Sequence, residues 1–289
     1  MRIYTQEELL EAFKGAGIDK GDTVLLTTRL YGVGKLEGAD TREQFCEAIY
    51  AVVREALGPK GTLVVPTFSQ QVGSHGVNYV HEETPCRTGI FAEYVLRRPD
   101  SIRSFHPVFS LTAEGSQASR ICENVSSTGF GHDSAMERLH RYGAKAVCIG
   151  FEYYTGHIVA GMHSIETLYG VPYYYNKIVT ADVYRDGKKC NKDFVINVRY
   201  LDFNIAFDYR RFIDLMARRS HIRQAPVGDS CVYSCTFADM FADGFDLLND
   251  DVYAFLKERP NWKRGVIPFE GSQQTITEEE AKRINWKLF

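Results

Sequence analysis

The sequence predicts an α/β fold in which a central mixed, partly parallel sheet is flanked by helices, with an antiparallel portion appended or inserted. Three observations support this prediction. Two apolar, β-rich runs enclose a long amphipathic pattern between residues 22 and 68, a second helix and strand pattern occupies residues 134–151, and polar and apolar residues alternate after Lys177. Alternating strands and helices are typical of parallel pairing, whereas polar and apolar alternation favours antiparallel hairpins.

The first expected element is a helix within residues 4–17. Thr5 is a suitable N-cap, a glutamate follows at the capping-box offset, and Leu9, Leu10 and Phe13 repeat at helical spacing. Two glycines then end the pattern.

Residues 22–68 form the next unit. The run "DTVLLTT" predicts a strand, "TREQFCEAIYAVVREALG" predicts an amphipathic helix that ends at Gly58, and "GTLVVPTF" predicts a second buried strand. A strand, helix and strand in this order indicate two parallel neighbours.

A second helix and strand are expected in residues 134–151. Ser134 is a suitable N-cap, and Glu137 has the spacing of a capping box. The run "AKAVCIGF" that follows predicts a buried strand.

Polar and apolar residues alternate in residues 178–203, which we interpret as a β-hairpin that turns at Asp186 and Gly187. The remaining residues mix helical and loop patterns. The chain has no internal repeat and no proline-rich linker, so we expect residues 1–289 to form a single domain.

The composition narrows the function classes. Hydrophobic residues make up 44% and charged residues 25% of the 289-residue chain, and the formal net charge is -3. A nearly balanced charge gives no overall field for nucleic acid or an anionic membrane. No apolar run approaches the length of a membrane span, and the N-terminus has acidic residues where a signal peptide needs its apolar core, so we expect a cytoplasmic protein.

The seven cysteines are odd in number and form no CxxC pair, which indicates reduced, packed thiols. Cys231 and Cys235 lie four apart, but no second pair at zinc-ligand spacing follows them. We therefore expect no metal site.

The segment "TTRLYGVG", residues 27–34, invites comparison with phosphate-binding loops. It fails the Walker pattern at Arg29 and Leu36, and the dinucleotide fingerprint at Glu37. What remains is a strand, a loop rich in hydroxyls and glycine, and a helix, which offers backbone N–H groups to an anion or a carbonyl. A tight turn without a ligand explains the same residues equally well.

His163 and Glu166 in "MHSIETLYGVPYYYNK" are candidates for catalysis. Residues three apart share a helix face, so the carboxylate can fix the tautomer of the imidazole, as a general base requires. Two polar residues on an exposed helical face are the alternative. His106, in "FHPVFS", is a structural hydrogen-bond donor or a site residue.

Taken in order, "GDTVLLTT", "LGPKGTLVVPTF", "FHPVFSLTAEG", "TGFGHDSAMERL", "AVCIGF" and "MHSIE" with "VPYYYNK" resemble the aminoglycoside 3-N-acetyltransferase family of coenzyme A (CoA)-dependent N-acyltransferases. The resemblance covers residues 21–177. It implies an α/β architecture distinct from the GNAT fold, and direct transfer of an acyl group from acetyl-CoA or another acyl-CoA to an amine, with no metal.

The resemblance also assigns residues. It implies that His163 and Glu166 are the catalytic pair, and that Thr67 and Ser110 lie near the pantetheine and thioester. Thr27 and Arg29 stand where the family has a histidine and a serine, and the segment between Gly150 and His163 is longer. The implied CoA-binding loop residues are Thr27, Thr28, Arg29, Leu30, Gly32 and Gly34.

The expected acceptor is a small-molecule amino sugar, and a peptide-like or polyamine acceptor is left open within the enzymatic interpretation. The tract "VPYYYNK" is similar to the branch that acylates nucleotide-linked amino-deoxy sugars for surface polysaccharides, which we prefer because an enzyme for polycationic aminoglycosides should be more acidic. An aminoglycoside antibiotic and a non-catalytic CoA or sugar-binding protein remain alternatives, and a homo-oligomer is left open. The expected acceptor-binding residues are His106, Tyr173, Tyr175, Asn176 and Lys177.

Overall fold

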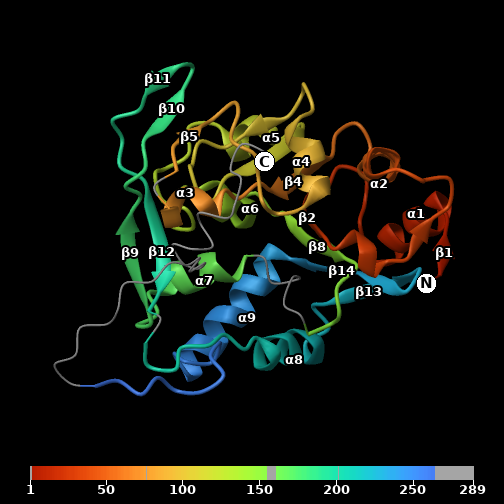
Figure 1. Cartoon of the computed structure of the whole chain (residues 1–289). Coiled ribbons are helices and arrows are strands. Elements are labelled where there is room, and N and C mark those ends of the chain that lie inside the picture. Colours follow the sequence, from red (N-terminus) through yellow and green to blue (C-terminus); the bar gives the residue numbers. More distant parts are fainter. Residues whose placement is uncertain (1, 76, 155–160, 201, 264–289) are drawn as a thin grey trace.

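The computed structural model describes residues 2–75, 77–154, 161–200 and 202–263. Among these residues the largest sheet has seven strands, and it crosses the whole α/β body (Figure 1). From one edge to the other the strands are β13 (Arg223–Val227), β14 (Ser230–Thr236), β8 (Lys145–Ile149), β2 (Thr23–Thr28), β4 (Thr62–Pro66), β7 (Leu111–Gly115) and β6 (Ile102–Arg103).

The sheet is parallel at its centre and antiparallel at both edges. Strand β2 pairs in parallel with β4 on one side and with β8 on the other. Strands β7 and β6 continue the sheet antiparallel beyond β4, and β14 and β13 do so beyond β8. The predicted mixed, partly parallel sheet is confirmed.

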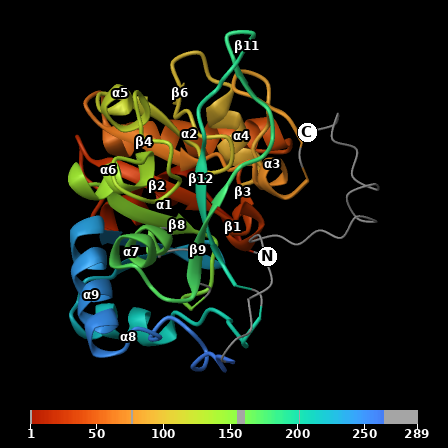
Figure 2. The same cartoon turned by 90° about the vertical axis from the view of Figure 1, so that its left-hand side faces the viewer.

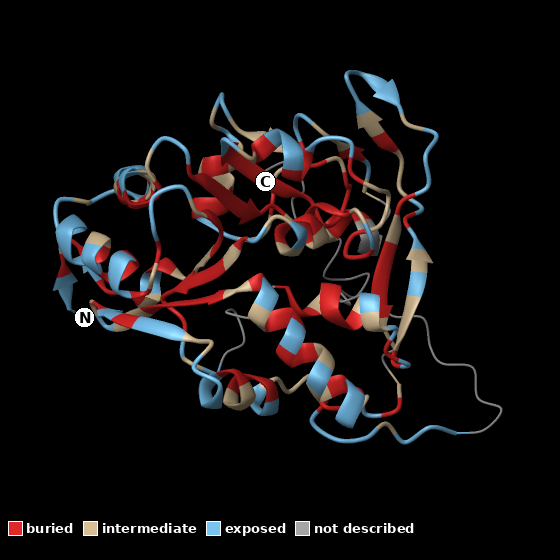
Figure 3. Cartoon of the chain, turned by 180° about the vertical axis from the view of Figure 1, so that it is seen from behind, coloured by how far each residue is buried: buried red, intermediate tan, exposed pale blue. Residues whose placement is uncertain are grey.

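Helices cover both faces of the sheet because the central strands are apolar on both sides. Val24 and Leu26 of β2 point into one core, and Leu25 between them points into the other. Figure 3 shows the central strands as a continuous buried layer. The first core includes residues of α1 (Gln6–Gly15), α2 (Arg42–Leu57) and α4 (Ile90–Leu96); the second includes residues of α3 (Gln70–His75), α5 (Ala118–Cys122), α6 (Ala135–Arg141), α7 (Met162–Tyr169), α8 (Arg210–Arg218) and α9 (Phe237–Asp250).

The predicted helix starts are observed. The hydroxyl of Thr5 accepts a hydrogen bond from the backbone N–H of Glu8, and the Glu8 carboxylate accepts one from Thr5 in return, which completes a capping box. Ser134 also caps its helix, but the Glu137 carboxylate accepts from the N–H of Asp133 instead of closing the box on Ser134.

The antiparallel portion forms two small sheets. Strands β10 (Val183–Arg185) and β11 (Lys188–Lys189) form the predicted hairpin, and both turn residues, Asp186 and Gly187, have positive φ. Strand β10 also pairs with β5 (Tyr79–Val80). The sequence did not predict that β12 (Val195–Arg199) pairs with β9 (Tyr174–Ile178), the strand directly after α7. The short β1 (Ile3–Tyr4) pairs with β3 (Lys35–Leu36), after the 3₁₀ turn η1 (Leu30–Gly32).

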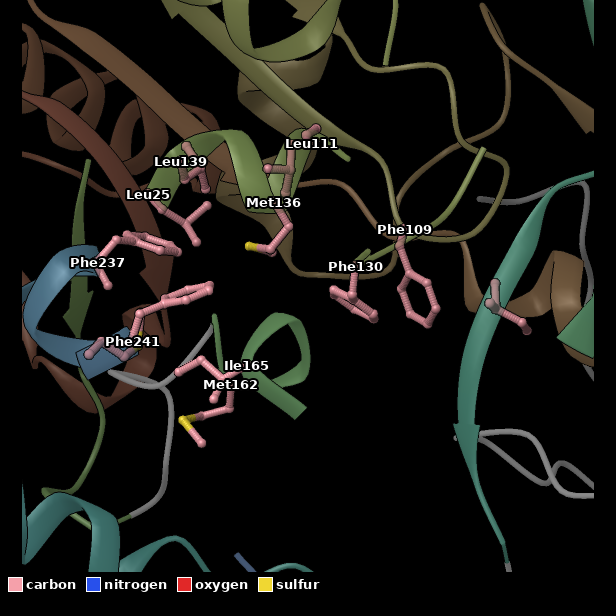
Figure 4. Close-up of a cluster of buried hydrophobic side chains, with 14 of the residues drawn as sticks. Leu25, Phe109, Leu111, Phe130, Met136, Leu139, Met162, Ile165, Phe237 and Phe241 are labelled. Carbon is pink, nitrogen blue, oxygen red and sulfur yellow. The ribbon is translucent and has the colours of Figure 1, made fainter. Parts of the chain in front are cut away.

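Helix α7 lies against α9, and both views of the chain place it beside β9 (Figures 1 and 2). Met162 and Ile165 on α7 belong to the same buried cluster as Phe237 and Phe241 on α9 (Figure 4). A Cβ atom on Gly244 of α9 would lie 2.9 Å from Cγ2 of Ile165, so the absence of a side chain allows the two helices to approach. This packing fixes the position of α7.

All seven cysteines are free thiols. Within the described ranges, no helix is both long and apolar enough to cross a membrane, and no three His, Cys, Asp or Glu side chains gather where they could hold a metal ion.

Candidate active site

The first turns of α7 bring His163 and Glu166 together. Nδ1 of His163 lies 2.9 Å from Oε2 of Glu166. The Glu166 side chain is completely buried, whereas the His163 side chain keeps 26% of its surface exposed. A residue spacing of three on a helix therefore places a buried carboxylate behind a partly accessible imidazole.

Two consecutive tyrosines complete the surroundings of the Glu166 carboxylate. The Tyr173 hydroxyl donates to Oε1 at 2.9 Å, and the Tyr174 hydroxyl donates to Oε2 at 2.7 Å. Burial, followed by the charge of Glu166, raises the pKa of both tyrosines far above its usual range, so both hydroxyls stay protonated and act as donors. The carboxylate thus accepts hydrogen bonds from three side chains.

These contacts select one tautomer of His163. Because both tyrosine hydroxyls donate to Glu166, the remaining acceptor position on Oε2 is filled by Nδ1–H of the imidazole. The Tyr174 hydroxyl oxygen lies 2.8 Å from Nδ1 of His163, so it also faces the Nδ1–H group of this tautomer. The lone pair is left on Nε2, which is the arrangement of a general base whose ring is oriented by a carboxylate.

The imidazole borders a cavity of about 1250 Å³. The cavity is formed by the end of β2 and the loop after it, the start of α2, the residues before α4, and the start of α7. Four of its lining residues are cationic, and none of the described lining residues is acidic. The cations are Arg29, Lys35, Arg42 and Arg87. This charge suits an anionic ligand of considerable size.

The loop after β2 forms part of the cavity wall. Thr27, Thr28, Arg29, Leu30 and Gly34, all predicted from the sequence, line it. The guanidinium of Arg29 donates to the Tyr31 hydroxyl at 2.7 Å and lies 4.9 Å from the centre of that ring.

Part of the expectation for this loop needs correction. The N–H groups of Arg29 and Gly32 bond to the carbonyls of Ile149 and Arg29, so neither is offered to a ligand. Gly32 is absent from the cavity lining, and a Cβ on it would lie 2.1 Å from the carbonyl oxygen of Gly150. This glycine therefore serves close packing between two chain segments.

Thr67 and Ser110 link the ends of two neighbouring strands. Both are fully buried, lie outside the described cavity lining, and face each other at the ends of β4 and β7. The Ser110 hydroxyl donates to the Thr67 carbonyl at 2.7 Å and accepts from Nε of Arg103 at 3.0 Å. Their hydroxyls therefore hold the two strand ends together, and a place beside the pantetheine stays a prediction.

His106 has the structural role that the sequence left open. Its side chain is buried, and Nδ1 accepts from the N–H groups of Val108 and Phe109 at 3.2 and 2.9 Å. Nε2 lies 3.3 Å from the carbonyl oxygen of Val195 on β12. Burial lowers the pKa of His106 to about 4, so the ring is neutral at physiological pH. These contacts make His106 a structural cross-link and favour that alternative over an acceptor contact.

Tyr173 lies in the protein interior, whereas Tyr175, Asn176 and Lys177 lie on β9. Tyr173 is fully buried and therefore cannot offer its ring to an acceptor. Tyr175 stacks on Tyr200 with the ring centres 4.9 Å apart, and the amide of Asn176 accepts from Asn197 at 2.6 Å. Lys177 pairs in register with Ile196 of β12. None of these residues belongs to the described cavity lining.

Several cavity residues escaped prediction. Arg42 is the first residue of α2, and Arg87 precedes a Thr-Gly pair and α4. A cation with a hydroxyl and a glycine before a helix is a usable signal for an anion site. Tyr209, directly before α8, also lines the cavity, and no sequence pattern pointed to it.

Comparison with known proteins gives a consistent answer. The sequence profile of the aminoglycoside 3-N-acetyltransferase family matches residues 25–249. An aminoglycoside N(3)-acetyltransferase III from a Salmonella species is 23% identical over 188 residues, which are 59% of this chain and 63% of the relative's length. An aminoglycoside N(3)-acetyltransferase IV, also from Salmonella, is 24% identical over 256 residues, covering 88% of this chain and 90% of the relative.

The fold is shared with solved structures. A structure of AAC-IIIb in a binary complex with CoASH superposes with a TM-score of 0.72 at 19% identity, covering 89% of this chain and all of that chain. The chain therefore belongs to the aminoglycoside 3-N-acetyltransferase family.

The tautomer of His163 provides a test of the site geometry. At alkaline pH, ¹⁵N NMR should show neutral His163 with its proton on Nδ1. In Glu166→Gln, Tyr173 keeps the side-chain oxygen engaged, so the new NH₂ group faces Nδ1 and the proton should move to Nε2.

Tyr173→Phe is the matched control for this experiment. It removes one donor but keeps the carboxylate, so the proton should stay on Nδ1. An Nε2–H tautomer in the wild-type protein would contradict the geometry.

Proposed function

We propose that this chain transfers an acetyl group from acetyl-CoA to an amino group of an aminoglycoside. The observation that carries the proposal is the His163 and Glu166 pair at the edge of a large cavity lined by cations. A general base suits the acceptor amine, and a cationic cavity suits the phosphorylated co-substrate.

Coenzyme A fits the cavity in size and charge. Its phosphates are anions, and the guanidinium groups of Arg29, Arg42 and Arg87 and the ammonium of Lys35 are placed to meet them. Apolar lining residues such as Leu30, Phe45 and Phe91 suit the neutral pantetheine arm. A polycationic aminoglycoside would be repelled by the same four side chains, so we assign this cavity to the co-substrate and expect the acceptor to approach His163 from outside it.

In the proposed reaction His163 takes a proton from the acceptor's ammonium group through Nε2. The neutral nitrogen then attacks the thioester carbonyl carbon, the carbon–sulfur bond breaks, and the imidazolium returns its proton to the departing thiolate. The second proton, which the attacking nitrogen carries until the amide forms, is released to solvent. Glu166 stabilises the imidazolium while it exists. A positioned base of this kind contributes about 10² to 10⁴ in rate.

An aminoglycoside replaces the nucleotide-linked amino sugar as the preferred acceptor. The matching relatives are named as aminoglycoside acetyltransferases, which supports an aminoglycoside as the acceptor. The tract that suggested a nucleotide-linked sugar is engaged within the protein, because Tyr173 and Tyr174 bond to Glu166. A non-catalytic role is disfavoured because such a protein has no need of an oriented base.

We also keep two broader expectations as proposals. Residues 1–289 act as one acyltransferase domain, because both hydrophobic cores are built on the same central sheet. The chain works in the cytoplasm, since seven free thiols suit a reducing compartment.

Removing a cavity cation should weaken CoA binding. We expect Arg42→Ala to raise the dissociation constant of CoA by about 5- to 10-fold, equivalent to ~1 kcal/mol, measured by isothermal titration calorimetry. Arg218→Ala is the matched control, because Arg218 is equally charged and exposed but lies outside the cavity lining. Equal affinities for the two variants would contradict the placement of CoA.

The acceptor is tested by thiol release from acetyl-CoA with a panel of aminoglycosides and nucleotide-linked amino sugars. We expect turnover with at least one aminoglycoside and a value of kcat/KM at least tenfold lower for every nucleotide-linked sugar. Turnover confined to the nucleotide-linked sugars would reverse the choice of acceptor, and CoA binding without turnover on any amine would favour the non-catalytic alternative.

A further inference from the structure

Tyr31 presents an exposed aromatic ring in the wall of the cavity. It belongs to the 3₁₀ turn η1 after β2, lines the cavity that His163 borders, and keeps 77% of its surface exposed. Ile90, the first residue of α4, lines the same cavity and is 44% exposed. One exposed apolar side chain needs no explanation, but two in the wall of one cavity indicate a contact surface for a ligand.

Arg29 holds the Tyr31 ring. Its Nε donates a hydrogen bond to the Tyr31 hydroxyl at 2.7 Å, and its guanidinium carbon lies 4.9 Å from the ring centre. A guanidinium is attracted by the π electrons of an aromatic ring, so the two contacts together restrict the tyrosine. Arg29 stands where the family pattern has a serine, whose short, uncharged side chain cannot make this contact. The pair of Arg29 and Tyr31 is therefore a feature of this chain and not of the family pattern.

The pair offers two kinds of contact side by side. Tyr31 presents a flat aromatic face, and Arg29, which also lines the cavity, has five guanidinium N–H groups, of which the bond to Tyr31 uses one. Aromatic faces stack on nucleobases, and guanidinium groups bind phosphates. A ligand that carries a planar base and a phosphate on the same sugar would match both side chains.

One end of CoA has this chemistry. Its ribose carries adenine, a phosphate and the diphosphate that leads to the pantetheine arm, and this nucleotide lies at the far end of the molecule from the thiol. The thioester must lie close to His163, whose neighbour Met162 is buried, whereas Tyr31 and Ile90 are exposed. A long ligand with an enclosed reacting end leaves its other end at the exposed part of the cavity wall.

We propose that the adenine ring of CoA stacks on Tyr31, and that Arg29 holds the tyrosine in place and pairs with a phosphate of the same nucleotide. This inference rests on the proposed function. The pantetheine arm has no planar ring to stack, and a polycationic aminoglycoside would be repelled by Arg29. Adenine is therefore the part of the two substrates that suits the exposed ring.

Calorimetry with CoA tests the stacking contact. We expect Tyr31→Ala to raise the dissociation constant of CoA roughly 5- to 20-fold, whereas Tyr31→Phe, which keeps the ring, should stay within about 3-fold of wild type. Tyr154→Ala is the matched control and should bind CoA as wild type does. Tyr154 is also an exposed tyrosine whose hydroxyl bonds to a charged side chain, that of Asp214, but it lies outside the described cavity lining. An unchanged dissociation constant in Tyr31→Ala would overturn the inference.

The adenine protons report the same contact by NMR. The ring current of an aromatic side chain shifts protons that lie over its face upfield. At saturating CoA, we expect H2 and H8 of the bound adenine to shift upfield in wild type, Tyr31→Phe and Tyr154→Ala, and the shift to be lost in Tyr31→Ala. Equal shifts in wild type and Tyr31→Ala would show that adenine lies elsewhere and would overturn the inference.

Neither measurement needs turnover, so the inference and the proposed function can fail separately. If adenine stacks on Tyr31 but no amine supports thiol release from acetyl-CoA, the proposed function fails and the stacking site stands. If thiol release proceeds while Tyr31→Ala binds CoA as wild type does, the inference alone fails. A wild-type protein that does not bind CoA would refute both.

Discussion

The arrangement of the site depends on the burial of the Glu166 carboxylate. A buried charge is strongly unfavourable unless hydrogen bonds replace its water, and three side chains do so here. Tyr173 lies in the turn before β9, Tyr174 is the first residue of β9, and His163 is on α7 itself. The contact between α7 and α9 at Gly244 therefore supports the chemistry, because it fixes the helix that carries both His163 and Glu166.

The sheet separates two tasks. Its central parallel strands and the loop after β2 form one wall of the cationic cavity, whereas α7 carries His163, the proposed base. An anionic co-substrate and a cationic acceptor need opposite fields, and the described cavity lining provides only the first. The His163 imidazole, which is the proposed base, lies where both can reach it, since it borders the cavity and remains partly exposed.

The sequence predicted the features that depend on local pattern. Apolar periodicity identified the central strands and their helices, and the Thr5 cap and the Asp186-Gly187 turn were found because their chemistry is local. Prediction from the sequence failed where a feature depends on contacts between residues that are far apart in the chain. The Thr67 and Ser110 hydroxyls meet only because β4 and β7 pair antiparallel. The three consecutive tyrosines also have long-range partners that no local pattern reveals, since Tyr173 and Tyr174 bond to Glu166 and Tyr175 stacks on Tyr200. Arg87 and Tyr209 reach the cavity through tertiary packing alone.

The central claim is that His163 is the base, and chemical rescue tests it most directly. In His163→Ala, thiol release with an aminoglycoside should be lost and should return in a saturable manner when imidazole is added, because the cavity bordering residue 163 is large enough to admit it. Retained CoA binding would show that the variant is folded. Undiminished turnover in His163→Ala without imidazole would contradict the account.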